Sequence, residues 1–147
     1  MSVYTIGFTK KNAETFFNFL KKADISKLID VRLNNTSQLS GFAKKNDLQF
    51  FLKELCNGAE YIHAPDLAPT KEILSAYKKQ EISWEKYEEE FLKLMKNRKI
   101  ELKYKQDFFE NGCLLCSEHE PHNCHRKIVV DYLRDYCNIN IEVKHLY

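Results

Sequence analysis

Short apolar runs alternate with helix-like stretches along the whole chain, and no other feature constrains the fold as strongly. Five of these runs have the length of β-strands, and they are apolar throughout instead of alternating in polarity. Strands of this kind are typical of a parallel sheet with helices on both faces. The sequence therefore predicts a three-layer α/β fold with a mostly parallel sheet of about five strands. The predicted strands are residues 3–6, 27–31, 59–63, 113–117 and 141–145.

Between the strands, apolar residues recur with helical spacing, and small polar residues stand where helices would begin. We expect Asn12, Thr70 and Ser83 to cap helices and Gly58 to end one. The sequence from 99 to 111 is ambiguous, and we assign it to a further helix. The helical residues predicted to face the core include Phe16, Phe17, Leu20, Phe51, Trp84, Phe91, Ile128, Val129, Tyr132, Leu133 and Tyr136.

The composition fits a single globular domain over residues 1–147. Hydrophobic residues make up 44% of the chain, and 23 basic residues nearly balance 21 acidic ones. This combination excludes a disordered chain. A net charge of +2 is low for a dedicated DNA-binding protein, so a role with nucleic acid would need a local basic patch.

No apolar run approaches the roughly 20 residues that a membrane span requires. The N-terminal stretch does not resemble a signal peptide. Five cysteines are an odd number, which does not favour a disulfide framework. We therefore expect a cytoplasmic protein with reduced thiols, no membrane contact and no cofactor.

In an open parallel sheet, ligands bind outside the carboxyl ends of the strands. The predicted strands deliver small or ionisable residues to that edge, whereas their amino ends carry mostly Lys, Asn and Gly. We know of no folding reason for this asymmetry, so it indicates a functional site. The candidates at the first four strand ends are Thr5, Gly7, Asp30, Arg32, His63 and Cys116.

Asp30 and Arg32 are two residues apart, so their side chains share one face of a strand. A salt bridge between them would position the guanidinium for a phosphate or carboxylate ligand. The alternative is an ion pair that only closes the strand end. Ser37, in the polar loop that follows, is a further candidate for substrate binding. His63 is a weaker one, because a single His in such a place is more often structural.

The segment 113–126 concentrates three Cys, three His and two Glu. One interpretation is a zinc site, with Cys113 and Cys116 in Cys-x-x-Cys spacing and Cys124 plus a histidine as the other ligands. Residues three apart on a strand point to opposite faces, so Cys113 and Cys116 would not converge. We therefore expect no metal ion here.

The other interpretation uses the start of the last helix, which we place at residues 121–123. Cys124, His125 and Arg126 would then occupy its first turn, where N–H groups and the helix dipole favour anions. The same field would lower the pKa of the Cys124 thiol, and His125 would act as acid or base. Alternatively, Cys124 is a small buried residue and Arg126 forms a structural ion pair. The catalytic candidates are Cys116, Cys124, His125, Glu118 and Asp30, and the substrate-binding candidates are Arg32, Arg126, Thr5, Gly7, His63 and Ser37.

With these residues in view, the sequence resembles the domain-of-unknown-function family 488 over its whole length. Four blocks in the family's order carry the resemblance. Phe8 departs from the pattern, because many members carry His after the glycine. The resemblance implies a cytosolic α/β domain whose blocks build a common site, and it implies no reaction. The blocks are residues 4–7, 30–42, 61–70 and 114–126.

The sequence thus favours an enzyme acting on a small anionic or phosphorylated, nucleotide-like substrate in a polar pocket at the carboxyl edge. It does not decide whether the chain is catalytic. One alternative is a nucleic-acid-binding module without catalysis, and another is a thiol or sulfur-transfer protein that uses Cys124. The nucleic-acid alternative would use Lys10, Lys11, Lys44 and Lys45 together with the polar loop at 34–40.

Overall fold

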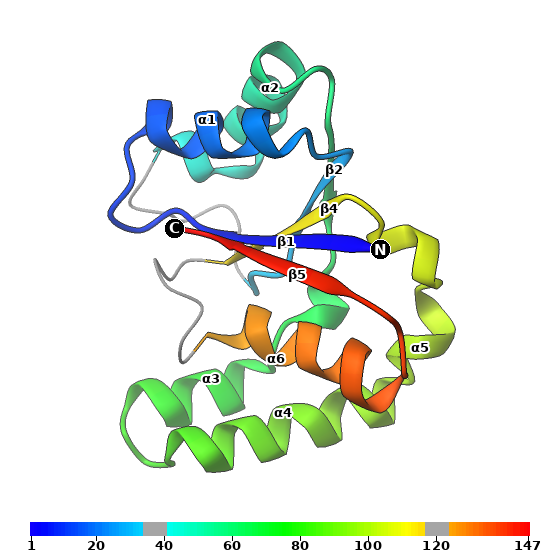
Figure 1. The fold of residues 1–147 in the computed structure, drawn as a ribbon. Coiled ribbons are helices and arrows are strands. Elements are labelled where there is room, and N and C mark those ends of the chain that lie inside the picture. The colour runs from blue at the N-terminus through cyan, green and yellow to red at the C-terminus, as the bar shows by residue number, and fades with distance from the viewer. Residues whose placement is uncertain (34–40, 117–123) are drawn as a thin grey trace.

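The strands form one all-parallel sheet in the order β3-β2-β4-β1-β5 (Figure 1). The computed structural model describes residues 1–33, 41–116 and 124–147. Within these residues it confirms the predicted α/β class, with five strands close to their predicted positions. They are β1 (Ser2–Gly7), β2 (Lys27–Asp30), β3 (Glu60–His63), β4 (Gly112–Cys116) and β5 (Glu142–Leu146).

Helices cover both faces of this sheet. The described residues form α1 (Ala13–Ala23), α2 (Lys45–Leu55), α3 (Lys71–Lys78), α4 (Trp84–Arg98), α5 (Ile100–Lys103) and α6 (His125–Asp131). α1 and α2 lie on one face, and α3, α4 and α6 lie on the other (Figure 1). Across the described ranges, no helix has both the length and the apolar character needed to traverse a bilayer.

Alternate residues of β4 supply the two cores that hold the layers together. Leu114 and Cys116 belong to the core under α4 and α6, whereas Cys113 and Leu115 belong to the core under α1 and α2. All five positions of β4 are buried. An apolar strand covered on both faces is what the uniform hydrophobicity of this segment predicts.

The predicted caps are present at three helix starts. Asn12 Oδ1 accepts a hydrogen bond from the Thr15 amide at 2.8 Å. Thr70 and Ser83 do the same for α3 and α4 through their hydroxyl oxygens. Each cap satisfies a backbone N–H that the helix itself leaves without a partner.

Residues 99–111 do not form the single helix that the sequence suggests. Lys99 takes a left-handed conformation with φ of 55° and ends α4. Its amide still bonds to the Met95 and Lys96 carbonyls, so α4 ends because the left-handed backbone of Lys99 redirects the chain. α5 then has only four residues, and a 3₁₀ helix follows over Gln106–Phe109.

The prediction for Tyr136 is also wrong, because its side chain is 51% exposed. α6 continues into a π-helical turn over Tyr132–Tyr136, closed by a bond from the Cys137 amide to the Tyr132 carbonyl. A π turn is wider than an α turn, so it shifts the residues that follow away from α-helical spacing. Tyr136 stacks on Tyr132 instead, with ring centroids 4.9 Å apart. Trp84 and Phe51, also predicted core residues, are only partly buried.

The start of α6 differs from the prediction in one respect that concerns the site. α6 begins at His125, and Cys124 is its N-cap residue with an extended backbone. Cys124 therefore precedes the first turn and does not stand within it. The predicted start at 121–123 lies outside the described residues.

Gly112 begins β4 at a point where a side chain has no room. A Cβ there would lie 3.0 Å from Ile29 Cδ1 and 3.1 Å from the Phe109 carbonyl oxygen. We expect Gly112→Ala to lower the free energy of unfolding by about 1–3 kcal/mol, because the extra carbon forces the strands apart. Urea denaturation measures this. Glu110→Ala, at an exposed neighbour, should stay within about 0.5 kcal/mol of the wild type. Equal stability of Gly112→Ala and the wild type would contradict the close approach.

Candidate functional site

An ion pair between Asp30 and Arg32 stands at the carboxyl end of β2. Arg32 Nε donates to Asp30 Oδ1 at 2.8 Å, and Arg32 Nη2 donates to Asp30 Oδ2 at 2.7 Å. The Arg32 amide also donates to Asp30 Oδ1. Asp30 is fully buried and Arg32 is 3% exposed. The predicted salt bridge is therefore present, bidentate and shielded from solvent.

Two further contacts fix this pair in place. The Tyr61 hydroxyl donates to Asp30 Oδ2 at 2.5 Å, and Arg32 Nη2 donates to the Ala43 carbonyl at 2.7 Å. The guanidinium carbon lies 5.5 Å from the centre of the Phe8 ring. Among the described residues, however, the buried Arg32 Nη1 has no hydrogen-bond partner. No sequence pattern signals the Ala43 contact, and the sequence predicts Tyr61 as a core residue as readily as a site residue.

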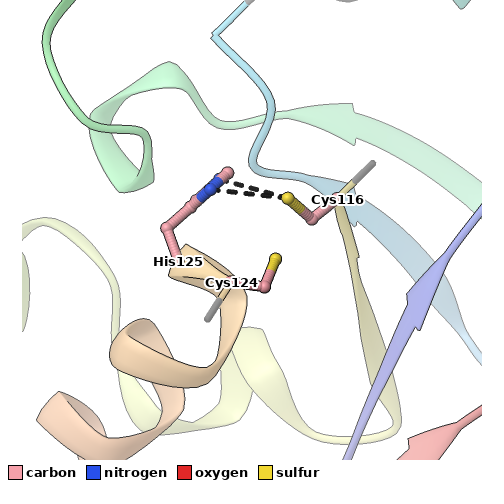
Figure 2. A group of neighbouring side chains, drawn as sticks. All are labelled: Cys116, Cys124 and His125. Atoms are coloured by element: carbon pink, nitrogen blue, oxygen red, sulfur yellow. Dashed lines mark hydrogen bonds between the residues drawn. The ribbon is translucent and has the colours of Figure 1, made fainter. Parts of the chain in front are cut away.

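A second group lies where β4 ends and α6 begins. Figure 2 shows Cys116, Cys124 and His125 directed toward a common space. Cys116 Sγ lies 3.4 Å from His125 Nδ1, and the two sulfurs and a ring nitrogen all lie within 4.8 Å of one another. All three side chains are buried. The structure thus joins three of the five predicted catalytic residues in one cluster.

The orientation of the imidazole is set by the backbone at Val31, the residue between Asp30 and Arg32. His125 Nε2 lies 2.6 Å from the Val31 carbonyl oxygen, so this nitrogen carries the proton and donates it. His125 Nδ1 is then the nitrogen with a lone pair, and Cys116 Sγ lies beside the ring, 3.4 Å from Nδ1 and 3.7 Å from Nε2. The ring also lies 5.9 Å from that of Phe91, which packs against it from α4.

The two groups lie on opposite sides of the sheet edge and are joined through Val31. Phe8 and Ala43, beside Arg32, belong to the core under α1 and α2. Cys116 and Cys124 belong to the core under α4 and α6. The sequence predicts that positions 32 and 125 share this edge. In the structure, His125 bonds to the carbonyl of Val31, the residue next to Arg32.

Two cations lie close together beside these groups. Arg126 is fully buried, and its charge acts on both His125 and Lys11. Burial, and then the Arg126 charge, lower the pKa of Lys11 to about 8. The nucleic-acid alternative places Lys11 on an exposed surface, but its side chain is buried. Its position after β1 is the signal in the sequence that could have placed it at the site.

The titration of Cys124 contradicts the expectation from the helix dipole. A hydrogen bond with Cys116 and then burial raise the pKa of the Cys124 thiol, and both outweigh the nearby positive charges. Burial also lowers the pKa of His125, so the ring is neutral at pH 7. Cys124 is therefore a thiol and not a thiolate in this state, which removes the argument for it as an activated nucleophile.

The remaining predicted residues divide into three groups. Thr5 Oγ1 is 2.6 Å from His145 Nδ1 and is buried, so its observed contact is structural. His63 Nε2 lies 2.9 Å from the Arg32 carbonyl oxygen and braces the strand end, and Gly7 is the β1 partner of Cys116. Ser37 and Glu118 lie outside the described residues. None of the five cysteines is in a disulfide, and Cys113 lies on the opposite face from Cys116, as the strand spacing predicts.

A family model described as "Domain of unknown function DUF488" covers residues 12–133 of this chain. The curated proteins and the solved structures contain no match.

Burial of the Asp30–Arg32 ion pair predicts a large loss of folding stability when one partner is removed. Asp30→Asn removes one charge and leaves the Arg32 guanidinium buried without its counterion. We expect it to lower the free energy of unfolding by about 3–5 kcal/mol, measured by chemical denaturation. The matched control is Lys93→Ala, which breaks an exposed pair with Glu89 in α4 and should change stability by less than about 1 kcal/mol. Similar losses in the two variants would show that the pair is not shielded from solvent.

Proposed function

Because the chain belongs to the family Domain of unknown function DUF488, whose name assigns no reaction, we propose a function from the site itself. We propose that the protein is an enzyme acting on a small anionic or phosphorylated substrate of nucleotide-like chemistry. The substrate's anionic group is bound at the carboxyl edge of the sheet by Arg32, with Arg126 and Lys11 adding positive charge.

The main support for the proposal is that the Arg32 guanidinium is held in a fixed orientation and has one nitrogen without a hydrogen bond to any described residue. Asp30, Ala43 and Phe8 hold it in one orientation, and its Nη1 is buried without a hydrogen-bond partner among the described residues. A buried donor without an acceptor costs about 1–3 kcal/mol. An oxyanion at this nitrogen removes that cost, and the pre-set orientation spares the entropy of ordering the side chain.

The positive charge around the edge supports the same ligand class. Arg32 and Arg126 are buried, and Arg126 lies near enough to Lys11 to lower the pKa of its amine. Positive charge concentrated at one edge of the sheet attracts anions, and a phosphate group carries both the charge and the acceptor oxygens for such a site.

The reactive groups that an enzyme needs stand on the other side of Val31. The Cys116 thiol and the neutral His125 imidazole are within hydrogen-bond reach, and Val31 orients the ring. Nucleophile–base pairs are built in this way, with a third group that fixes the base. This arrangement supports chemistry next to the anion site in preference to simple binding.

The two alternatives receive less support. Lys11 is buried and cannot contribute to a nucleic-acid-binding surface, although Lys10, Lys44 and Lys45 are exposed. Sulfur transfer by Cys124 requires a reactive thiolate, and the pKa of this thiol is raised. Binding of a single-stranded oligonucleotide with a steep salt dependence would revive the first alternative.

The recognition step is tested with inorganic phosphate and sulfate as probes. We expect both to bind and to raise the melting temperature, with dissociation constants measured by calorimetry. Arg32→Lys keeps the charge beside Asp30 but loses the guanidinium fork, so it should weaken binding at least about tenfold, the value of one charge-assisted hydrogen bond. Lys44→Ala, at an exposed position, should bind like the wild type. Equal affinity in wild type and Arg32→Lys would overturn the proposal.

The pKa of Lys11 predicts a pH dependence for the same binding. Sulfate keeps its charge across the neutral and mildly alkaline range, so changes in affinity report on the protein. Because the pKa of Lys11 is lowered to about 8, the amine loses its charge above that pH and sulfate affinity should fall. Lys11→Arg keeps a cation throughout and should remove this fall. If the sulfate affinity of Lys11→Arg falls with pH as it does in the wild type, Lys11 is excluded from the anion site.

A further inference from the structure

Three potential metal ligands converge at the junction of β4 and α6. Cys116 comes from the end of the strand, and Cys124 and His125 come from the start of the helix (Figure 2). Their ligand atoms lie within 4.8 Å of one another, and all three side chains are at most 8% exposed. The anion site at Arg32 uses none of them, so metal binding does not depend on anion binding there. The proposed chemistry does use Cys116 and His125, and a bound metal ion replaces their nucleophile–base interaction.

The imidazole already has the tautomer of a metal ligand. Histidines that bind metals nearly always donate their other ring N–H to a carboxylate or a backbone carbonyl, which fixes the tautomer and the ring plane. His125 Nε2 makes this bond to the Val31 carbonyl at 2.6 Å. Cys116 Sγ lies 3.4 Å from His125 Nδ1 and 3.7 Å from Nε2, so the thiol lies beside the ring, and Nδ1 is the nitrogen left with a lone pair for a metal ion.

The spacing of the donors fits a small tetrahedral ion. With zinc–sulfur bonds near 2.3 Å and zinc–nitrogen bonds near 2.0–2.1 Å, neighbouring sulfur and nitrogen ligands lie about 3.6 Å apart and two sulfurs about 3.8 Å apart. The observed 3.4 Å is close to the first value, and the 4.8 Å limit leaves at most about 1 Å of closure for the others. Ordinary side-chain rotation supplies a closure of that size.

We propose that Cys116, Cys124 and His125 form a binding site for a thiophilic divalent metal ion, with zinc as the expected occupant. Two thiolates and one imidazole select soft or borderline ions, whereas calcium and magnesium require oxygen ligands. On binding, each thiol releases its proton to solvent and its sulfur lone pair forms the bond to the metal. The described residues supply three ligands, and water or a substrate atom would take a fourth position, as in catalytic zinc sites.

Cys113 provides an internal comparison for this cluster. It lies three residues before Cys116 on the same strand and is equally buried, but it packs with Ile6 and Leu115 in the other core. A cysteine that only fills space has surroundings of that kind. The arrangement around Cys116 differs because a second thiol and an oriented imidazole stand beside it.

The test is a titration of the fully reduced full-length protein with cobalt(II), followed by displacement with zinc. We expect one cobalt per chain, intense sulfur-to-cobalt charge-transfer absorption in the near ultraviolet, and visible bands of tetrahedral strength that zinc abolishes. This measurement needs no variant, so misfolding of a mutant cannot obscure it. Absence of the charge-transfer absorption in the wild type would overturn the proposal.

Variants then assign the ligands. Cys116→Ser, Cys124→Ser and His125→Gln should each weaken zinc binding more than about 100-fold, because removal of a group that only orients a ligand already costs roughly 10–100-fold. Cys113→Ala and Cys137→Ser keep the three ligands and should bind like the wild type. Equal losses in the controls and the ligand variants would overturn the assignment. The proposed anion site is tested by a different experiment, the binding of sulfate to Arg32→Lys, so the two proposals can fail independently.

Discussion

The carboxyl edge of this sheet depends on one buried interaction, the ion pair between Asp30 and Arg32. Taking both charges out of water is expensive, and the pair is tolerated because nearly every lone pair and proton has a partner. Asp30 accepts from the Arg32 amide and guanidinium and from Tyr61. The turn that closes this pair holds Val31 between its two ends. The Val31 carbonyl then orients His125, so the geometry of the Cys116 cluster follows from the pair.

A buried ion pair is a weak source of stability, since apolar residues of the same volume serve as well or better. Its retention at a strand end is therefore better explained by function. The pair places a rigid guanidinium at the edge where parallel sheets bind ligands, with one nitrogen that no described residue satisfies. On the other side of Val31, two thiols and an imidazole form a compact soft-ligand set. Recognition and reactivity are thus assigned to opposite faces of one strand end.

The fold was largely predictable, because its signals are local. Uniformly apolar strands imply burial on both faces, and Asn12, Thr70 and Ser83 could be identified as caps from their side chains alone. The predictions failed where backbone geometry departs from regular periodicity. Lys99 adopts a left-handed conformation that no residue preference foretells, and the π turn at Tyr132–Tyr136 displaces Tyr136 from the core.

The site was predictable in composition but not in electrostatics. Strand ends of a parallel sheet meet at one edge, which is why Asp30, Arg32, Cys116 and His125 could be grouped from the sequence. The pKa of Cys124 depends on burial and on the second thiol, and the burial of Lys11 depends on how the turn after β1 folds back. Such effects come from tertiary packing and cannot be predicted from residue spacing.

The central claim is that Arg32 presents an unsatisfied donor to an oxyanion. A crystal structure of the protein with selenate, located by its anomalous scattering, tests this most directly. The account predicts a selenate oxygen within hydrogen-bond distance of Arg32 Nη1, with the Asp30 contacts unchanged. Selenate bound only at exposed lysines, with Nη1 still without an acceptor, would contradict it.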